Sequence, residues 1–198
     1  MLISASLVLL AYLMGSISSA IVVSRLMKLP DPRSLGSGNP GATNVLRTGS
    51  KKAAALTLVG DAVKGFVPIM LAMILTTDVN IIALVATAAF LGHLYPVFFA
   101  FKGGKGVATA IGVFLAVSPP VALMLLASWM IVFYLSKISS LSALIATSLA
   151  PVFTHFYLGE SAYTSMAVFL SVMIIYRHKK NIVGLIAGKE SKITSKKN

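Results

Sequence analysis

The chain has 198 residues, of which 57% are hydrophobic and only 11% are charged, and it contains no cysteine. Since a typical soluble domain has about a quarter of its residues charged, this composition excludes an ordinary soluble fold and predicts an all-α polytopic membrane protein. The lack of cysteine excludes disulfide bonds and thiol catalysis. The net charge of +12 has two explanations, nucleic-acid binding or basic residues gathered on the cytoplasmic side of a membrane.

Apolar runs predict seven transmembrane helices, each of roughly 20 residues, in a single domain over residues 1–198. The first run, 2–24, lacks a basic start and a cleavage site, so we expect a retained span and not a signal peptide. The run 107–135 is too long for one span, and adjacent prolines in Ser118-Pro119-Pro120 break helices. This run therefore predicts a hairpin whose first helix is unusually short. The other spans are expected at residues 53–76, 80–101, 138–157 and 162–176.

The basic residues are distributed asymmetrically around these spans. With seven spans, every Lys and Arg except Lys64 falls on the same side as the C-terminus, while the turns near 77–79, 118–120 and 158–161 hold none. The positive-inside rule then predicts an N-terminus outside and a C-terminus in the cytoplasm. It also explains the positive net charge without nucleic-acid binding, so we expect the protein to contact the lipid bilayer and no nucleic acid.

Three cytoplasmic segments, about 28–52, 101–109 and 177–190, contain more polar residues and glycines than are needed to set the topology. In the first, glycines alternate with short polar residues up to Asn44, and Arg47 follows. Successive backbone N–H groups in such a turn can bind an anion, and an arginine can fork around a phosphate. A flexible glycine-rich connector is the alternative.

The second segment places Gly103, Gly104 and Gly106 around Lys105, directly before a predicted helix. The N–H groups and the positive dipole at a helix start favour an anion. The Walker A pattern is not met, because Phe99 stands in place of its first glycine and a glycine replaces its Ser or Thr. Phosphate binding is thus favoured over ATP hydrolysis, and a plain turn with topology lysines is the alternative.

In the third segment, His178 and Asn181 share a face if the last helix continues, whereas Lys179 and Lys180 are expected to anchor that helix at the lipid headgroups. Within the spans, Asp61 and Lys64 suggest a functional site or a helix-internal ion pair that orients a neighbouring basic residue. His93 is expected to pack or to form hydrogen bonds. The five carboxylates and three histidines show no metal-binding pattern, so neither a metal nor a cofactor is expected.

Four stretches carry a family resemblance: residues 36–44 (GSGNPGATN), 92–98 (GHLYPVF), 101–109 (FKGGKGVAT) and 177–182 (RHKKNI). They resemble the bacterial acyl-phosphate:glycerol-3-phosphate acyltransferase family over nearly the whole chain. The resemblance implies an enzyme of the bacterial inner membrane, with its active site facing the cytoplasm, that makes lysophosphatidic acid from glycerol 3-phosphate and acyl phosphate. By motif match, the residues that hold the phosphate of glycerol 3-phosphate would be Ser37, Arg47, Lys105, His178 and Asn181. Further substrate-binding candidates are Gly38, Asn39, Thr43, Asn44, Gly103, Gly104 and Gly106, of which the last three would hold the acyl-phosphate headgroup.

An acyl phosphate is already activated, so the protein need not supply a covalent nucleophile. Ser37 is the one obvious candidate for an acyl-enzyme, but we expect it to bind phosphate while the glycerol hydroxyl attacks directly. No carboxylate is placed to act as the base, so a substrate phosphate oxygen is the expected proton acceptor. An anion transporter and a noncatalytic scaffold remain as rivals, and the oligomeric state stays open, a monomer included.

Overall fold

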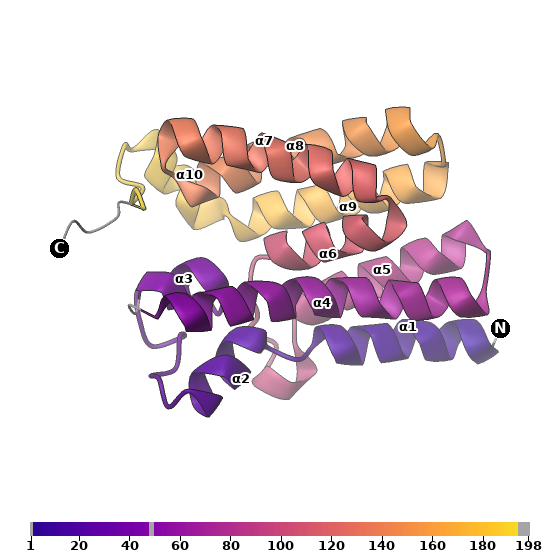
Figure 1. Cartoon of the computed structure of the whole chain (residues 1–198), viewed down its shortest axis with the longest axis horizontal. Helices are drawn as coiled ribbons and strands as arrows, with labels where there is room; N and C mark the ends of the chain where they lie inside the picture. Colours follow the sequence, from indigo (N-terminus) through magenta and orange to yellow (C-terminus); the bar gives the residue numbers. More distant parts are fainter. Residues whose placement is uncertain (1, 48–49, 194–198) are drawn as a thin grey trace. The chain divides into compact units, whose positions relative to one another are not determined.

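The computed structural model describes residues 2–47 and 50–193, a part of the chain that is helical throughout apart from its connections. The chain divides into two compact units, residues 1–117 and 118–198. Helices of the first unit are α1 (Leu2–Gly15), α2 (Ser19–Leu26), α3 (Ala42–Arg47), α4 (Lys51–Leu75), α5 (Val79–Leu94), a short 3-10 helix (Val97–Phe99) and α6 (Val107–Val117). The second unit contains α7 (Pro119–Ser136), α8 (Ser139–Leu158), α9 (Ser161–Arg177) and α10 (Lys179–Ile186), and Figure 1 shows both sets.

Several of these helices could cross a membrane. Four are long and apolar enough: α4, α5 with the 3-10 turn that follows it, α7 and α8. A fifth arises if α1 and α2, bent by 45° at their break, count as one span. The apolar helices α6 and α9 have 11 and 17 residues, fewer than the roughly 20 of a straight span. The described residues therefore contain four or five candidate spans by length and composition, and seven spans stay a prediction.

The predicted helix break within residues 107–135 is confirmed, while the pairing of its two helices as a hairpin stays a prediction. Helix α6 ends at Val117 and α7 begins at Pro119, so the break falls at the predicted Ser118-Pro119-Pro120. Proline suits the first turn of a helix, where its missing N–H would have no partner anyway. The first helix of the pair is short, as expected.

Two elements differ from the sequence prediction. The run 2–24 is not one helix, because it breaks at residues 16–18 between α1 and α2. At this break the Ile17 carbonyl accepts a hydrogen bond from the Lys64 ammonium, with Nζ 2.7 Å from the oxygen, in place of a helical N–H. The second difference is α3, a short helix inside the segment 28–52, where only a turn was expected.

Glycines bring two helix pairs of the first unit into backbone contact. A methyl group added at Gly112 of α6 would overlap the Ala62 carbonyl of α4, and one at Gly65 of α4 would overlap the Thr109 carbonyl of α6. Inside a membrane, helix association depends on such close packing because lipid tails are as apolar as the side chains. Helices α1 and α5 also come into backbone contact, at Gly15 and Gly92.

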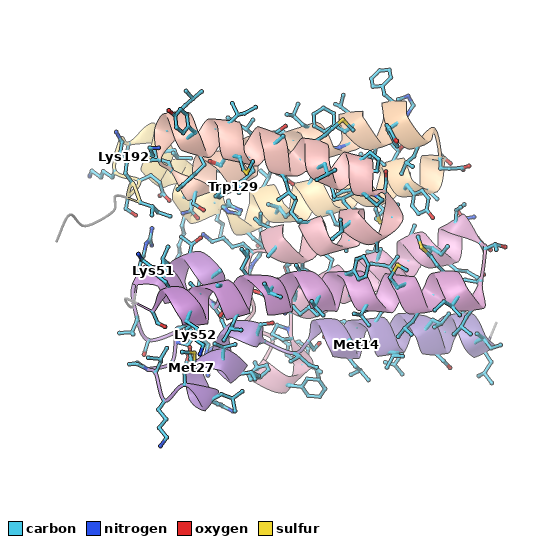
Figure 2. All side chains as sticks on the ribbon, in the orientation of Figure 1. Met14, Met27, Lys51, Lys52, Trp129 and Lys192 are labelled. Carbon is cyan, nitrogen blue, oxygen red and sulfur yellow. The ribbon has the colours of Figure 1, made fainter. Side chains whose placement is uncertain are left out.

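Within the first unit the helix ends alternate. The start of α1 and the α4–α5 turn lie at one end, and α3 and the start of α4 lie at the other (Figure 1). Lys51 and Lys52, exposed residues in the first turn of α4, mark this second end in Figure 2. Two candidate segments from the sequence analysis belong to this unit, 28–52 and 101–109. Each follows a helix that runs toward this second end.

Candidate functional site

The first segment folds around the side chain of Asn44. This amide is only 2% exposed and donates hydrogen bonds to the carbonyls of Pro32 (2.6 Å) and Leu35 (3.0 Å). Its oxygen accepts the Ser37 N–H at 2.9 Å. One buried side chain therefore fixes the path of the loop on both sides of Gly36, which has a φ of 55° that favours glycine.

An ion pair stiffens the start of the same loop. The Arg33 guanidinium binds the Asp31 carboxylate through two nitrogens, the shortest contact being 2.7 Å. This hydrogen-bonded pairing lowers the pKa of Asp31 and raises the pKa of Arg33 from their usual values. Both groups are partly exposed, so the pair orients the loop more than it stabilises the fold.

Helix α3 carries the loop back onto the core of the first unit. Its apolar face packs in a cluster with α2 and α4, and Met27, labelled in Figure 2, lies against this cluster. Arg47, the last residue of α3, is exposed, and a methyl group at Gly36 would come within 3.9 Å of its Cδ. The fold thus brings the Arg47 side chain beside the Gly36-Ser37 turn, where Ser37 is also exposed. The members of the cluster are Ala20, Val45, Ala53 and Ala54, with Val23, Met27, Leu29 and Leu46 packed against it.

The other candidates in this loop are less tightly placed. Gly38 is exposed with a φ of 69°, while Asn39 and Thr43 are half-buried. Residues 48 and 49 of the predicted segment lie outside the described residues. The structure therefore groups Ser37, Asn44 and Arg47 most clearly.

The glycine turn of the second segment, Gly103–Gly106, lies against the end of α5. The Gly104 N–H donates to the His93 carbonyl at 3.2 Å. A methyl group at Gly104 would overlap Nε2 of the His93 ring, and one at Gly103 would overlap the His93 carbonyl. Only glycine permits this approach, which sets the turn directly on His93. Lys105 is half-buried two residues before α6 begins.

Beneath the turn lies a network of buried ionisable side chains. Asp61 and Lys64 form an ion pair one helical turn apart on α4, with 3.0 Å between Oδ1 and Nζ. Nδ1 of His93 lies 3.6 Å from the same carboxylate oxygen. The helix-internal ion pair is confirmed, and His93 is buried, as a packing or hydrogen-bonding role requires. That the pair reaches His93 and the glycine turn was missed, because no local sequence pattern links Asp61 to His93, 32 positions later.

In the second unit, the last helix does not continue through His178. This residue ends α9 and precedes α10, and its ring Nδ1 lies 2.8 Å from the Ile174 carbonyl. A carbonyl only accepts hydrogen bonds, so Nδ1 carries a proton and Nε2 is an acceptor in the neutral ring and a donor in the charged one. The condition under which His178 and Asn181 were expected to share a face, a last helix that continues through His178, is therefore not met.

The Asn181 amide points instead to a carboxylate. Its Nδ2 donates to Glu190 Oε1 at 2.6 Å, and the Ser140 hydroxyl donates to the same oxygen at 2.7 Å. The sequence analysis did not predict Glu190 as the partner of Asn181, although a single acidic residue within a basic tail was the available signal. Lys179 lies 4.9 Å from the centre of the Tyr176 ring, a contact that suits the predicted headgroup anchor. Among the described residues, none of the Asp, Glu and His groupings could hold a metal ion.

Known proteins resemble this chain over nearly all of its length. The family described as glycerol-3-phosphate acyltransferase matches residues 5–188. The glycerol-3-phosphate acyltransferase of Thioalkalivibrio sulfidiphilus is 56% identical over 99% of this chain and 97% of its own, and that of Methylococcus capsulatus is 53% identical over 94% of each. Crystal structures of PlsY (YgiH), an integral membrane glycerol 3-phosphate acyltransferase, are 41% identical and cover 96% of this chain. Its glycerol 3-phosphate form has a TM-score of 0.92 over 96% of that chain, and its lysophosphatidic acid form 0.90 over 95%. With apolar helices and a family match over this length, the chain belongs to the glycerol-3-phosphate acyltransferase family of integral membrane proteins.

Proposed function

We propose that this enzyme transfers a fatty acyl group from an acyl phosphate to the 1-hydroxyl of glycerol 3-phosphate. The products are lysophosphatidic acid and inorganic phosphate. The observation that carries the donor assignment is the glycine turn at the start of α6, which suits a phosphate headgroup. The glycerol 3-phosphate and lysophosphatidic acid forms of the related crystal structures support the acceptor and the product.

The acyl phosphate headgroup lies, in this proposal, against the N–H groups that follow Gly104. The Gly104 N–H itself is engaged by the His93 carbonyl, whereas the first N–H groups of α6 have no partner within their own helix. A phosphate at this place also meets the positive end of the helix dipole. The acyl chain then extends between helices, in line with lipid tails.

Glycerol 3-phosphate is bound by the cationic and polar side chains of the three segments. By motif match we assign its phosphate to Ser37, Arg47, Lys105, His178 and Asn181, with Gly38, Asn39 and Thr43 as further substrate-binding residues, while Asn44 acts through the loop that it holds. Two anionic substrates repel one another, so these positive groups are needed to bring them together.

The reaction needs no covalent acyl-enzyme. The glycerol 1-oxygen attacks the acyl carbon, the bond from that carbon to the phosphate oxygen breaks, and the hydroxyl proton moves to a phosphate oxygen. Holding the two groups in place can supply about 7–11 kcal/mol of the barrier reduction. We further propose seven spans in a bacterial inner membrane, with the N-terminus outside and the three segments cytoplasmic, in accord with the distribution of lysine and arginine.

The test uses purified protein in detergent with radiolabelled glycerol 3-phosphate. We expect lysophosphatidic acid to form with acyl phosphate and not with acyl-CoA, and the rate to be unchanged by a metal chelator. Initial rates at varied concentrations of both substrates should give intersecting lines. Robust transfer from acyl-CoA alone would refute the donor, and parallel lines, or acyl label trapped on Ser37, would refute direct attack.

A further inference from the structure

The buried ionisable groups of the first unit form one continuous chain of contacts. It starts at the Ile17 carbonyl in the break between α1 and α2, which holds the Lys64 ammonium at 2.7 Å. It continues from Lys64 to Asp61 over 3.0 Å and from Asp61 to Nδ1 of His93 over 3.6 Å. The opposite edge of the His93 ring, Nε2, lies where a side chain on Gly104 would stand. The chain of contacts thus joins α1, α4 and α5 to the glycine turn.

Stability alone does not explain these charges. Asp61, Lys64 and His93 are 3%, 7% and 6% exposed, and burying an ion pair costs about as much as its attraction returns. An apolar pair of similar volume would fill the same space between helices that already pack through glycine. Ionisable residues within a membrane span are therefore better explained by a role.

The role follows from how His93 touches Gly104. The backbone carbonyl of His93 accepts the Gly104 N–H, and its ring lies under the Gly104 Cα. A rotation of the ring about its side-chain torsions would therefore push against the turn or leave a gap below it. The carboxylate of Asp61 lies next to Nδ1 and favours one ring orientation, while Lys64, held by Ile17, keeps that carboxylate in place.

We propose that Lys64, Asp61 and His93 are positioning residues that set the conformation of the Gly103–Gly106 turn, and so its affinity for the phosphate of the acyl donor. The inference rests on the proposed function, which assigns the donor headgroup to this turn. None of the three residues touches the reacting atoms. Their loss raises the KM for acyl phosphate while the KM for glycerol 3-phosphate and kcat change little.

Two double variants separate positioning from simple packing. Asp61→Leu with Lys64→Met removes both charges and the carboxylate oxygen that lies beside His93 Nδ1. Asp61→Asn with Lys64→Met removes both charges equally but keeps an amide oxygen beside Nδ1. Neither leaves an unpaired buried charge, so both should insert, which thermal unfolding in detergent will verify.

We expect the Leu/Met variant to raise the KM for acyl phosphate roughly tenfold, the scale of one lost interaction with a charged group. The Asn/Met variant should stay within about threefold of the parent by the same reasoning. Equal KM values for the two variants, or equal changes for both substrates, would overturn the inference.

A single variant covers the case in which neither double variant inserts. His93→Phe keeps a ring under Gly104 and the Asp61–Lys64 pair, but has no nitrogen facing the carboxylate. It should also raise the KM for acyl phosphate alone, and an unchanged KM would overturn the inference. If the unmodified enzyme makes no product from acyl phosphate, the proposed function itself fails, so the two failures are distinguishable.

Discussion

Replacing Asn44 tests whether the first segment owes its shape to one buried amide. Asn44→Ala removes two donated hydrogen bonds and one accepted one. The bond to Pro32 is buried and the other two are partly exposed, so we count about 1–3 kcal/mol for the first and about 0.5–1 for each of the others. The sum, about 2–5 kcal/mol, is large compared with the local stability of most surface loops.

The loop carrying Ser37 and Arg47 should therefore lose its order before the helices do. We expect the KM for glycerol 3-phosphate to rise at least about tenfold, because 1.36 kcal/mol corresponds to one decade, and the thermal midpoint to fall. Initial rates and thermal unfolding of the purified protein measure both quantities. Asn80→Ala is the matched control, since Asn80 is exposed at the start of α5 and makes a single 3.3 Å side-chain bond to Asp78.

Asn44→Asp sharpens the test, because it keeps the acceptor for the Ser37 N–H but replaces Nδ2, which donates both hydrogen bonds, with one oxygen that faces the Pro32 and Leu35 carbonyls. It should be at least as damaging as Asn44→Ala. A KM within twofold of the parent for either variant, with an unchanged thermal midpoint, would refute the reasoning.

Three further predictions concern other parts of the chain. Arg47→Ala and Lys105→Ala should each lower activity about tenfold to a hundredfold, because one lost charge-assisted contact with phosphate is worth roughly 1.5–3 kcal/mol. As controls, Lys179→Ala and Lys180→Ala should change the activity little. Similar small effects at all four positions in initial-rate assays would favour a purely topological role. Gly112→Ala should destabilise the first unit strongly, because its methyl group meets the α4 backbone. Gly60→Ala should destabilise it less, because its methyl group meets the Ser19 side chain, which can rotate away. Equal thermal midpoints for the two variants would contradict this prediction. The pKa of Asp31 is lowered by its hydrogen bonds to Arg33. The stability that Asp31 contributes is therefore present above the usual carboxyl pKa and is lost as the pH falls through the lowered value. When thermal unfolding is followed as the pH is lowered, Asp31→Asn should lose less stability than the parent below about pH 4.

The sequence predicted those features that depend on neighbouring residues. The paired prolines located the α6–α7 break, and an ion pair was one of the two hypotheses that the spacing of Asp61 and Lys64 suggested. The break between α1 and α2 could not be predicted, because its replacement hydrogen bond comes from Lys64, 47 positions away.

The same limit applies to the candidate site. Motif patterns indicated the glycine turn, but not that His93 lies directly under it. They also did not reveal that Asn181 is paired with Glu190, because the turn after α10 brings the two together. Side chains that act through distant partners leave no periodic signal in the sequence.

The shortness of α6 has a consequence for how a lipid substrate reaches the enzyme. Its 11 residues measure about 16 Å, roughly half the thickness of the hydrocarbon layer. The glycine turn packs on His93, next to Asp61, which lies ten residues into α4, or about 15 Å from the start of that helix. Under the proposed function and topology, a headgroup bound at this turn would lie about halfway into the hydrocarbon layer, deeper than the headgroups of the surrounding lipids. A donor dissolved in the bilayer would then reach the turn by lateral diffusion, and its acyl chain would not have to pass through water.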